Sequence, residues 1–201
     1  MSKYKFHPPY AYKLGSEPFV FWNKGFTEEE CDKIVEFGKQ KQLSSATINV
    51  NTTDTAWRRS AINWISEKEQ PWLYSKLEYI IQQLNGQYYN FDLWGFHEDL
   101  QFTIYKEENA GFYDWHVDSF SSVINNIDQR LPRKLSVVVQ LSDPEDYEGG
   151  TLCVNSGRIQ SAPKAKGTVI AFPSYMLHKV NPVTKGRRYS LVMWVCGPHF
   201  R

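Results

Sequence analysis

The sequence contains no long apolar run, no closely paired cysteines and no excess of one charge. No segment approaches the roughly 20 apolar residues that a membrane-spanning helix needs, so a membrane partner is not expected. The 23 Lys and Arg residues nearly balance the 22 Asp and Glu residues, which leaves a net charge of +1. This balance disfavours a dedicated nucleic-acid-binding protein or a membrane-surface protein, since both usually carry a basic face.

Other absences bear on location and domain number. The first residues, MSKYKFHPPY, reach prolines before any apolar core, unlike a signal peptide. Cys31, Cys153 and Cys196 are scattered without a CxxC pair, which is typical of buried reduced thiols rather than of a disulfide framework. We therefore expect a cytoplasmic protein. No repeat or low-complexity linker interrupts the 201 residues, which predicts a single domain over 1–201 with an irregular arm at 1–16.

Two helices are predicted in the first half of the chain. A threonine followed three residues later by a glutamate forms a capping-box pattern, which predicts a helix over about 28–40. Proline opens a second segment, 71–89, with apolar residues at helical spacing. This segment predicts a helix that ends near Asn85 and Gly86. The polar stretch between them, 44–57, predicts a strand edge followed by a long loop.

Short segments rich in β-branched and aromatic residues predict strands over much of the remaining chain. These segments are 18–26, 100–107, 111–120, 134–142, 150–155, 167–173 and 189–197. Because no crossover helices separate the later strands, we expect antiparallel pairing. The pattern predicts a mainly β fold with flanking helices (α+β), in which a sandwich or barrel carries the helices on one outer face.

A histidine and an aspartate two residues apart form the first candidate metal site. His116 and Asp118 project to the same face if they lie in a strand. His178 follows another predicted strand and a short turn, so it is the candidate third ligand. Two histidines and one carboxylate leave the opposite positions of an ion open, which suits iron(II). By chance alone an HxD pair is far more often structural. His7, His97 and His199 each lack an acidic partner at strand spacing in a plausible pocket, so they are expected to be structural or surface residues.

An arginine and a serine near the carboxyl end supply a second candidate feature. Arg188 lies ten residues beyond His178, and Ser190 follows on the same strand face. A buried arginine beside a hydroxyl can bind one carboxylate of a dicarboxylic acid through charge-assisted hydrogen bonds. Arg187 points to the opposite face in a strand, so we expect it to be solvated.

Three motifs together resemble those of a known family. FYDWHVD, the EGGTL turn and the pattern H-x-V-x-P-V-T-x-G-x-R resemble the prolyl 4-hydroxylase-like branch of the 2-oxoglutarate and iron(II)-dependent oxygenases, with PKHD-type hydroxylases the most similar in motif. The resemblance covers about 18–197 and is strongest over 100–195. It implies a distorted double-stranded β-helix, or jelly roll. It also implies a hydroxylase that consumes O2 and 2-oxoglutarate and releases succinate and CO2, with ascorbate as a reductant.

The resemblance also assigns roles to residues. His116, Asp118 and His178 correspond to the iron(II) ligands, and Arg188 to the residue that binds the distal carboxylate of 2-oxoglutarate. Tyr105 matches a tyrosine that contacts this cosubstrate, although it also fits a packed strand tyrosine. Two further candidates are Gln140 and Ser190. Gln140 either contacts the cosubstrate or caps the sheet, whereas Trp194 is expected to pack beneath the site.

The substrate and some rival functions stay open at this point. A prolyl residue in a polypeptide is favoured, with a free amino acid or another small molecule as the alternative. A metal hydrolase on a cupin-like barrel or an inactive binding module would retain the fold. Segments 47–64 and 119–133 are candidate lids or recognition loops. Nucleic-acid modification is a minor option that rests on a basic groove at Arg58, Arg59, Arg130 and Arg133. A monomer or weak dimer is expected.

Overall fold

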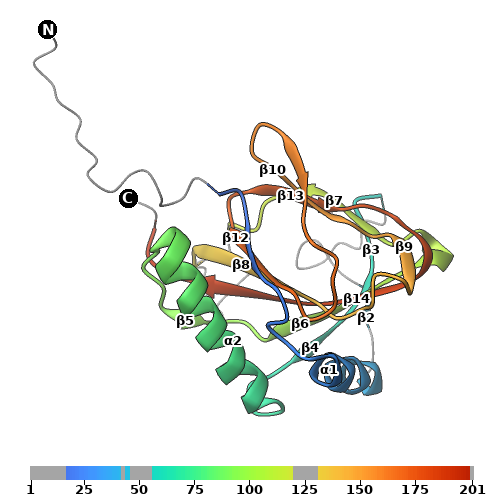
Figure 1. The fold of residues 1–201 in the computed structure, drawn as a ribbon, viewed down its shortest axis with the longest axis horizontal. Coiled ribbons are helices and arrows are strands. Elements are labelled where there is room, and N and C mark those ends of the chain that lie inside the picture. Colours follow the sequence, from blue (N-terminus) through green and yellow to red (C-terminus); the bar gives the residue numbers. More distant parts are fainter. Residues whose placement is uncertain (1–16, 42–43, 46–55, 120–130, 200–201) are drawn as a thin grey trace, which may run out of the picture.

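The structure is a computed structural model that describes residues 17–41, 44–45, 56–119 and 131–199. The expected arm at 1–16 and most of the two candidate lids lie outside the described residues. Two antiparallel sheets face one another, and Figure 1 shows both helices on the side of the larger sheet that faces away from the smaller one. In the described part of the chain, no helix has the length and apolar character that a membrane crossing requires.

The larger sheet has nine strands. Seven form its main path in the order β1 (Val20–Trp22), β12 (Val169–Pro173), β8 (Arg133–Gln140), β14 (Val183–Cys196), β6 (Leu100–Lys106), β4 (Ala61–Ile65) and β2 (Ser44–Ser45), while β5 (Gly95–Phe96) and β9 (Tyr147–Gly149) pair with β14. The smaller sheet has the order β11 (Ile159–Ser161), β10 (Leu152–Asn155), β13 (Leu177–Val180), β7 (Phe112–His116) and β3 (Arg58–Arg59).

Both predicted helices are confirmed. Helix α1 (Glu28–Gln40) begins with a complete capping box, in which Thr27 and Glu30 each accept a hydrogen bond from the other's backbone N–H. Helix α2 (Pro71–Leu84) begins at a proline and continues into a π-helical turn, η1 (Asn85–Tyr89). A short 3-10 helix, η2 (Glu107–Asn109), links β6 to β7.

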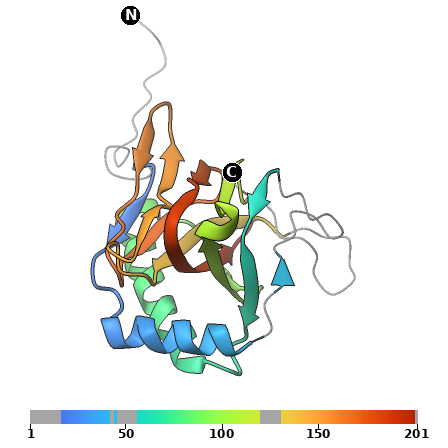
Figure 2. The ribbon, with the colours of Figure 1, turned by 90° about the vertical axis from the view of Figure 1, so that its right-hand side faces the viewer.

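Two apolar layers hold the fold together. The first lies between the helices and the outer face of the larger sheet, and includes Ile34, Leu77, Val137 and Leu191. The second lies between the two sheets, where residues of β8, β12 and β14 that alternate with the first set point inward. Figure 2 shows the same arrangement from the side, with α1 below the sheets. The antiparallel two-sheet architecture confirms the predicted jelly roll.

The segment 47–64 contains more regular structure than predicted. Its carboxyl end forms β3 and most of β4, and β4 pairs with β6 over five residues. Two polar residues of the described part, Arg58 and Asn63, are buried with partners. Arg58 donates to the Gln101 side chain, and the Asn63 side chain donates to the Gly38 carbonyl. Polarity therefore predicted exposure where the protein instead satisfies buried polar groups.

Candidate metal centre

The three candidate ligands meet between the sheets. His116 ends β7 and His178 lies on the adjacent β13, where the two residues are register partners. Asp118 follows β7 by two residues, and its backbone N–H donates to the Ser174 carbonyl at 2.8 Å. One ligand atom from each of the three residues lies within 4.8 Å of the others. The sequence prediction that His178 joins the HxD pair from a neighbouring strand is thus confirmed in its geometry.

Both histidines are held in the tautomer that a metal ion needs. His116 Nδ1 lies 2.7 Å from the Asp114 carbonyl, and His178 Nδ1 lies 2.9 Å from the Met176 carbonyl. A carbonyl only accepts hydrogen bonds, so each Nδ1 carries the proton and each Nε2 keeps a free lone pair. Both Nε2 atoms face the Asp118 carboxylate, at 3.7 Å from His116 and 3.3 Å from His178.

The Asp118 carboxylate is oriented from behind by a serine. Ser136 Oγ on β8 donates to Asp118 Oδ2 at 2.9 Å, and Ser174 Oγ lies 3.0 Å from Ser136 Oγ. Such outer contacts fix the direction of a ligand and are as much part of a metal site as the ligands. The sequence analysis missed Ser136 and Ser174, because a single hydroxyl on an apolar strand carries no recognisable pattern.

The electrostatics of His116 and Asp118 favour the protonation states that bind a cation. Burial lowers the pKa of His116 to about 3, with the nearby His178 adding to the effect, so its imidazole is neutral. Burial alone would raise the pKa of the Asp118 carboxyl, but its position between the two imidazoles and near the Arg133 guanidinium outweighs burial and the pKa falls. An ionised carboxylate beside a neutral imidazole is the charge state that a divalent cation selects.

The donor set fits a divalent transition metal. Ligand atoms on one face of an ion with bonds of about 2.1 Å lie roughly 3 Å apart, close to the separations of 3.3 and 3.7 Å from Asp118 to the histidines. Among the described residues no fourth His, Cys, Asp or Glu joins the group. Within the described ranges, the opposite face of an ion held here would therefore be free of such ligands, which is the arrangement that non-haem iron(II) oxygenases use.

The ring of Tyr113 lies on the imidazole of His116, contrary to the simple alternation expected for this strand. Plain alternation places Tyr113 and Trp115 opposite His116. Instead, two residues of β7 oppose one of β13 between the pairs Val180–Tyr113 and His178–His116, which is a β-bulge. The bulge turns Tyr113 toward the ligands and leaves Trp115 beside Lys179. An extra residue in a strand shifts every later side chain to the other face.

Arg188 is the most deeply buried cation near this centre. It is 1% exposed, and its Nη2 donates to Gln140 Oε1 at 2.9 Å. Its Nε and Nη1 are buried without a hydrogen-bond partner, and it has no ion pair with a described residue. Unpartnered buried N–H groups on a cation are costly unless an anion binds them. Arg187 instead lies in solvent and pairs with Glu108 at 2.8 Å. Arg188 is thus buried and Arg187 is exposed, as the alternation of strand residues predicted.

The other candidate cosubstrate residues surround Arg188. Tyr105 on β6 is its register partner, with the guanidinium carbon 5.3 Å from the ring centre. Ser190 pairs with Gln140, and both are almost fully buried. Gln140 also donates to the Pro163 carbonyl at 2.8 Å, so both ends of its amide are bonded within the protein.

Gln140 lies on the same face of β8 as Ser136, the serine behind Asp118. The two residues are four apart, about 13 Å along the strand, with Val138 between them on this face. Because Ser136 donates to Asp118 and Gln140 accepts from Arg188, the ligands and Arg188 lie toward opposite ends of this face. Trp194, the register partner of Ser136, is buried beneath the site as predicted, with Arg133 stacked on it.

The predicted basic groove is not present among the described residues. Arg58 is buried and stacks on Tyr113, with its N–H groups directed at Ser60 and Gln101. Arg133 forms a two-point ion pair with Glu98. Of the other histidines, His97 and His199 are exposed, as predicted, and His7 and Arg130 lie outside the described residues.

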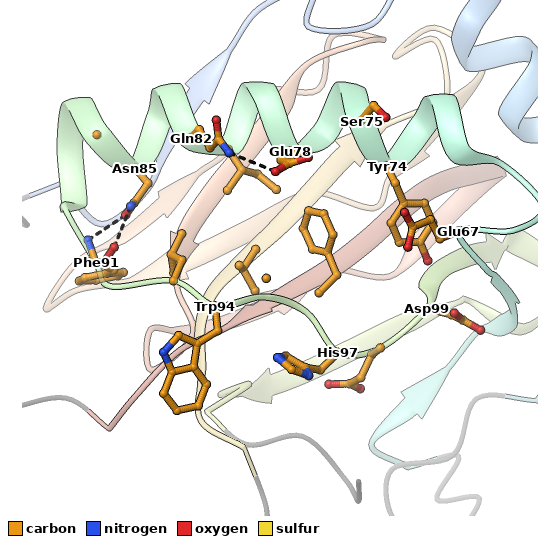
Figure 3. A pocket seen from close by; sticks show the side chains of 17 residues that line it. Glu67, Tyr74, Ser75, Glu78, Gln82, Asn85, Phe91, Trp94, His97 and Asp99 are labelled. Atoms are coloured by element: carbon orange, nitrogen blue, oxygen red, sulfur yellow. Dashed lines mark hydrogen bonds between the residues drawn. The ribbon is translucent and has the colours of Figure 1, made fainter. Parts of the chain in front are cut away.

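A cavity of about 830 Å³ lies elsewhere, between α2 and the segment that leads to β6. Figure 3 shows Trp94, His97 and Asp99 across the cavity from Ser75, Glu78 and Gln82 of α2. Four carboxylates and no Lys or Arg line it, and none of the three candidate ligands does. An anionic cosubstrate would be repelled there, so we place the chemistry at the histidines rather than in this cavity.

Comparison with known proteins decides the family. Residues 100–196 match the 2OG-Fe(II) oxygenase superfamily, in which 2OG denotes 2-oxoglutarate, and these residues contain all three ligands and Arg188. Over these residues the chain belongs to that superfamily. A PKHD-type hydroxylase of Pseudomonas aeruginosa is 38% identical over 86 residues, which are 42% of this chain and 38% of the relative. The chain thus aligns with less than half the length of the curated relative.

Solved structures support the fold over a longer range. A Pseudomonas putida prolyl-4-hydroxylase superposes with a TM-score of 0.69 at 18% identity, covering 92% of this chain and 95% of that chain. A prolyl hydroxylase from Trichoplax adhaerens, in complex with a hypoxia inducible factor oxygen degradation domain peptide fragment, gives 0.72 at 18% identity, covering 90% of this chain and 84% of that chain. These matches establish the double-stranded β-helix fold of this chain.

Proposed function

We propose that this protein is a 2-oxoglutarate-dependent non-haem iron(II) dioxygenase that hydroxylates an aliphatic C–H group of its substrate. One observation carries the proposal. A two-histidine, one-carboxylate group with an open face shares the space between the sheets with a buried arginine whose Nε and Nη1 lack partners. The first binds iron(II), and the second binds the distal carboxylate of 2-oxoglutarate by charge-assisted hydrogen bonds.

The residues of this chain have distinct roles in the proposal. His116 and His178 present neutral Nε2 atoms, because backbone carbonyls hold their Nδ1 protons. Asp118 presents an ionised carboxylate that Ser136 orients. Arg188, with Tyr105 and Ser190 beside it, fixes the far end of the cosubstrate, while Gln140 orients the guanidinium. When bound, iron(II) and 2-oxoglutarate together activate O2 for hydroxylation, with succinate and CO2 as by-products.

For the substrate we propose a prolyl residue in a polypeptide, with a free amino acid or other small molecule as the second candidate. The support is the fold shared with prolyl hydroxylases, one of which is solved with a peptide. The partly exposed ring of Trp57 also supplies a flat wall for a pyrrolidine ring. Trp57 is 40% exposed, and its carbonyl accepts from the Asp114 N–H, which places it next to the strand of His116.

Two rivals explain less of the geometry. A metal hydrolase would use the same three ligands with water but has no role for Arg188 and its unpartnered N–H groups. An inactive binding module would have no reason to keep both imidazoles in the metal-binding tautomer. We further propose that 1–201 forms a single domain. The cytoplasmic location, the monomer or weak dimer and the use of ascorbate stay predictions.

The test mixes purified protein with iron(II) and 2-oxoglutarate without oxygen. A weak visible absorption band that needs both additions supports the oxygenase, and no band in either order of addition contradicts it. Succinate is then measured after air is admitted, together with mass spectrometry of candidate substrates for the gain of one oxygen atom. Hydrolysis of a substrate without succinate would favour the metal hydrolase.

A further inference from the structure

The cavity of about 830 Å³ between α2 and the segment that leads to β6 has no role in the function proposed above. Figure 3 shows Glu78 on the helix side of this cavity, with Trp94 and His97 across from it. Its volume is in the range of sites that bind a small ligand or a few residues of peptide. None of the three metal ligands lines it, so an occupant would bind without touching them.

Three carboxylates of the cavity have no ion-pair partner among the described residues. Glu67, Glu78 and Asp99 line it and are exposed, and none of them forms an ion pair with a residue that the structure describes. The fourth carboxylate, Glu98, is neutralised by Arg133. Like charges gathered around one cavity repel one another unless a cation lies between them. The charge of the cavity therefore favours a cationic occupant and disfavours an anionic one.

Aromatic side chains line the same cavity. The Trp94 indole is 57% exposed, while its backbone N–H donates to the Cys196 carbonyl at 2.8 Å, which holds the residue in place. The ring of Phe96 packs against that of Tyr74 at 5.7 Å between centres. Ammonium and guanidinium groups are attracted to the face of an aromatic ring, most strongly to indole, and the stems of lysine and arginine pack on apolar surface. Rings beside carboxylates therefore fit a basic side chain better than a bare metal cation.

Arg133 connects this cavity to the metal centre. Its Nε donates to Glu98 in the cavity wall at 2.7 Å, and its guanidinium stacks on Trp194 at 3.9 Å from the ring centre. Its backbone N–H donates at 3.0 Å to the carbonyl of Ser119, the residue after Asp118. One arginine thus spans the interval between the cavity and the segment that carries a metal ligand. A few residues of extended peptide cover such an interval, so a polypeptide held at the metal can reach the cavity with a neighbouring segment.

We propose that the cavity binds a segment of the polypeptide substrate that carries lysine or arginine, a proposal that rests on the polypeptide substrate proposed above. The ammonium or guanidinium group binds between Glu78 and Asp99, and its stem packs on Trp94. This segment lies a few residues from the one that is hydroxylated. The protein thus selects polypeptides with basic residues near the target and disfavours those with acidic residues there.

The first test measures peptide binding without iron or 2-oxoglutarate. A fluorescein-labelled peptide that alternates lysine with glycine, and contains no proline, is titrated with the full chain and followed by fluorescence anisotropy. We expect saturable binding of this peptide and none of the matched glutamate–glycine peptide. Glu78→Gln combined with Asp99→Asn should weaken binding of the lysine peptide by about fivefold and make its salt dependence shallower. Trp94→Ala should weaken it by about threefold.

Two matched control variants separate the cavity from general effects of charge and of surface rings. Glu36→Gln combined with Asp146→Asn makes the same change in net charge at exposed carboxylates that do not line the cavity. Tyr79→Ala removes a ring that is 58% exposed on α2 but does not line the cavity. Neither control should change the affinity for the lysine peptide measurably.

A second measurement connects the cavity to turnover. A proline-containing peptide is compared with the same peptide extended by the lysine–glycine segment, and 2-oxoglutarate decarboxylation is the readout. In the parent protein the extension should lower KM by about fivefold and leave kcat unchanged, because it adds binding that is equal in the ground state and the transition state. The extension should have little effect on KM in the Glu78→Gln, Asp99→Asn variant.

The outcomes separate this inference from the proposed function. Equal affinity of the parent and the Glu78→Gln, Asp99→Asn variant for the lysine peptide, or an extension that leaves KM unchanged in the parent, would overturn the inference and leave the oxygenase assignment intact. Peptide binding that appears only after Lys3, Lys5 and Lys13 are replaced by serine would assign the cavity to the chain's own basic segment. A dimer of the parent that dissociates in the carboxylate variant would assign it to a second copy. Either result would also overturn the inference, whereas failure of every candidate substrate to yield succinate would overturn the proposed function.

Discussion

The ring of Tyr113 is stacked on the imidazole of His116, with 3.5 Å between ring centres and 16° between their planes. The guanidinium of Arg58 covers Tyr113 at 4.5 Å from its ring centre. The metal ligand is therefore clamped from one side by an aromatic ring, which is itself fixed by a buried arginine. This stack depends on the bulge in β7, because plain alternation would point the two rings to opposite faces.

We predict that Tyr113→Ala lowers metal affinity by about tenfold, because an outer contact that orients a ligand typically contributes that much. Tyr113→Phe should retain most of the affinity, since the flat ring remains. Titration with cobalt(II), followed by its visible spectrum, gives both values. If the Phe variant lost as much affinity as the Ala variant, the hydroxyl and not the ring would hold the site.

The three ligands should be individually essential for turnover. His116→Ala, Asp118→Ala or His178→Ala is expected to abolish succinate formation from 2-oxoglutarate while circular dichroism retains the parent spectrum, since ligands contribute little to the apolar layers. His97→Ala is the matched control, because His97 is exposed and lies away from the group. Near-normal succinate production by His178→Ala would show that the third ligand is wrong.

The two neighbouring arginines should differ sharply. Arg188→Ala is expected to cost about 2–5 kcal/mol in 2-oxoglutarate binding, the range for losing one partner of a buried charge pair. Arg188→Lys should recover only part, because an ammonium lacks the planar fork. Arg187→Ala should change binding little, since Arg187 is solvated and paired with Glu108. Calorimetric titration of the three variants tests this order, and the reverse order would mean that Arg187 faces the cosubstrate.

Local patterns predicted most of the fold and the ligands. Capping and periodicity located both helices, and the period of two in strands placed Arg188 inside and Arg187 outside. Local patterns failed where the direction of a side chain, or the presence of a strand, depended on contacts with residues distant in sequence. The bulge at β7 is a property of its pairing with β13, and β4 is recognisable only once Asn63 has the Gly38 carbonyl as a partner. Ser136 acquires its role only from Asp118, 18 residues away in sequence.

Because two thiols are buried, we predict that the free energy of unfolding decreases in alkali. Burial raises the pKa of Cys31 and of Cys196 to about 11, from an ordinary 9.0. Between pH 9 and 11 the unfolded chain loses these protons while the folded chain keeps them, so the free energy of unfolding falls as pH rises. For Cys31 the fall reaches about 2 kcal/mol by pH 10.5.

Urea unfolding of the parent protein and of Cys31→Ala isolates this effect from other titrations. The variant loses packing at every pH but also loses the titrating thiol. The difference in unfolding free energy between the two proteins should thus be largest near pH 8 and narrow by about 2 kcal/mol at pH 10.5. Parallel pH profiles would show that the Cys31 thiol ionises as readily in the folded protein as in the unfolded chain.

The substrate prediction is tested by how strongly candidates stimulate 2-oxoglutarate decarboxylation. We expect proline-rich peptides to raise the rate above the uncoupled background and to gain one oxygen, because an extended peptide can place a pyrrolidine ring beside the open face of the metal. Matched peptides with alanine in place of proline should do neither. Free proline and other amino acids form the second arm of the comparison. Stimulation only by a free amino acid, without oxygen gain in any peptide, would replace the polypeptide by a small molecule as substrate. The iron and 2-oxoglutarate assignments would stand, because they depend on the three metal ligands and Arg188 rather than on the identity of the substrate.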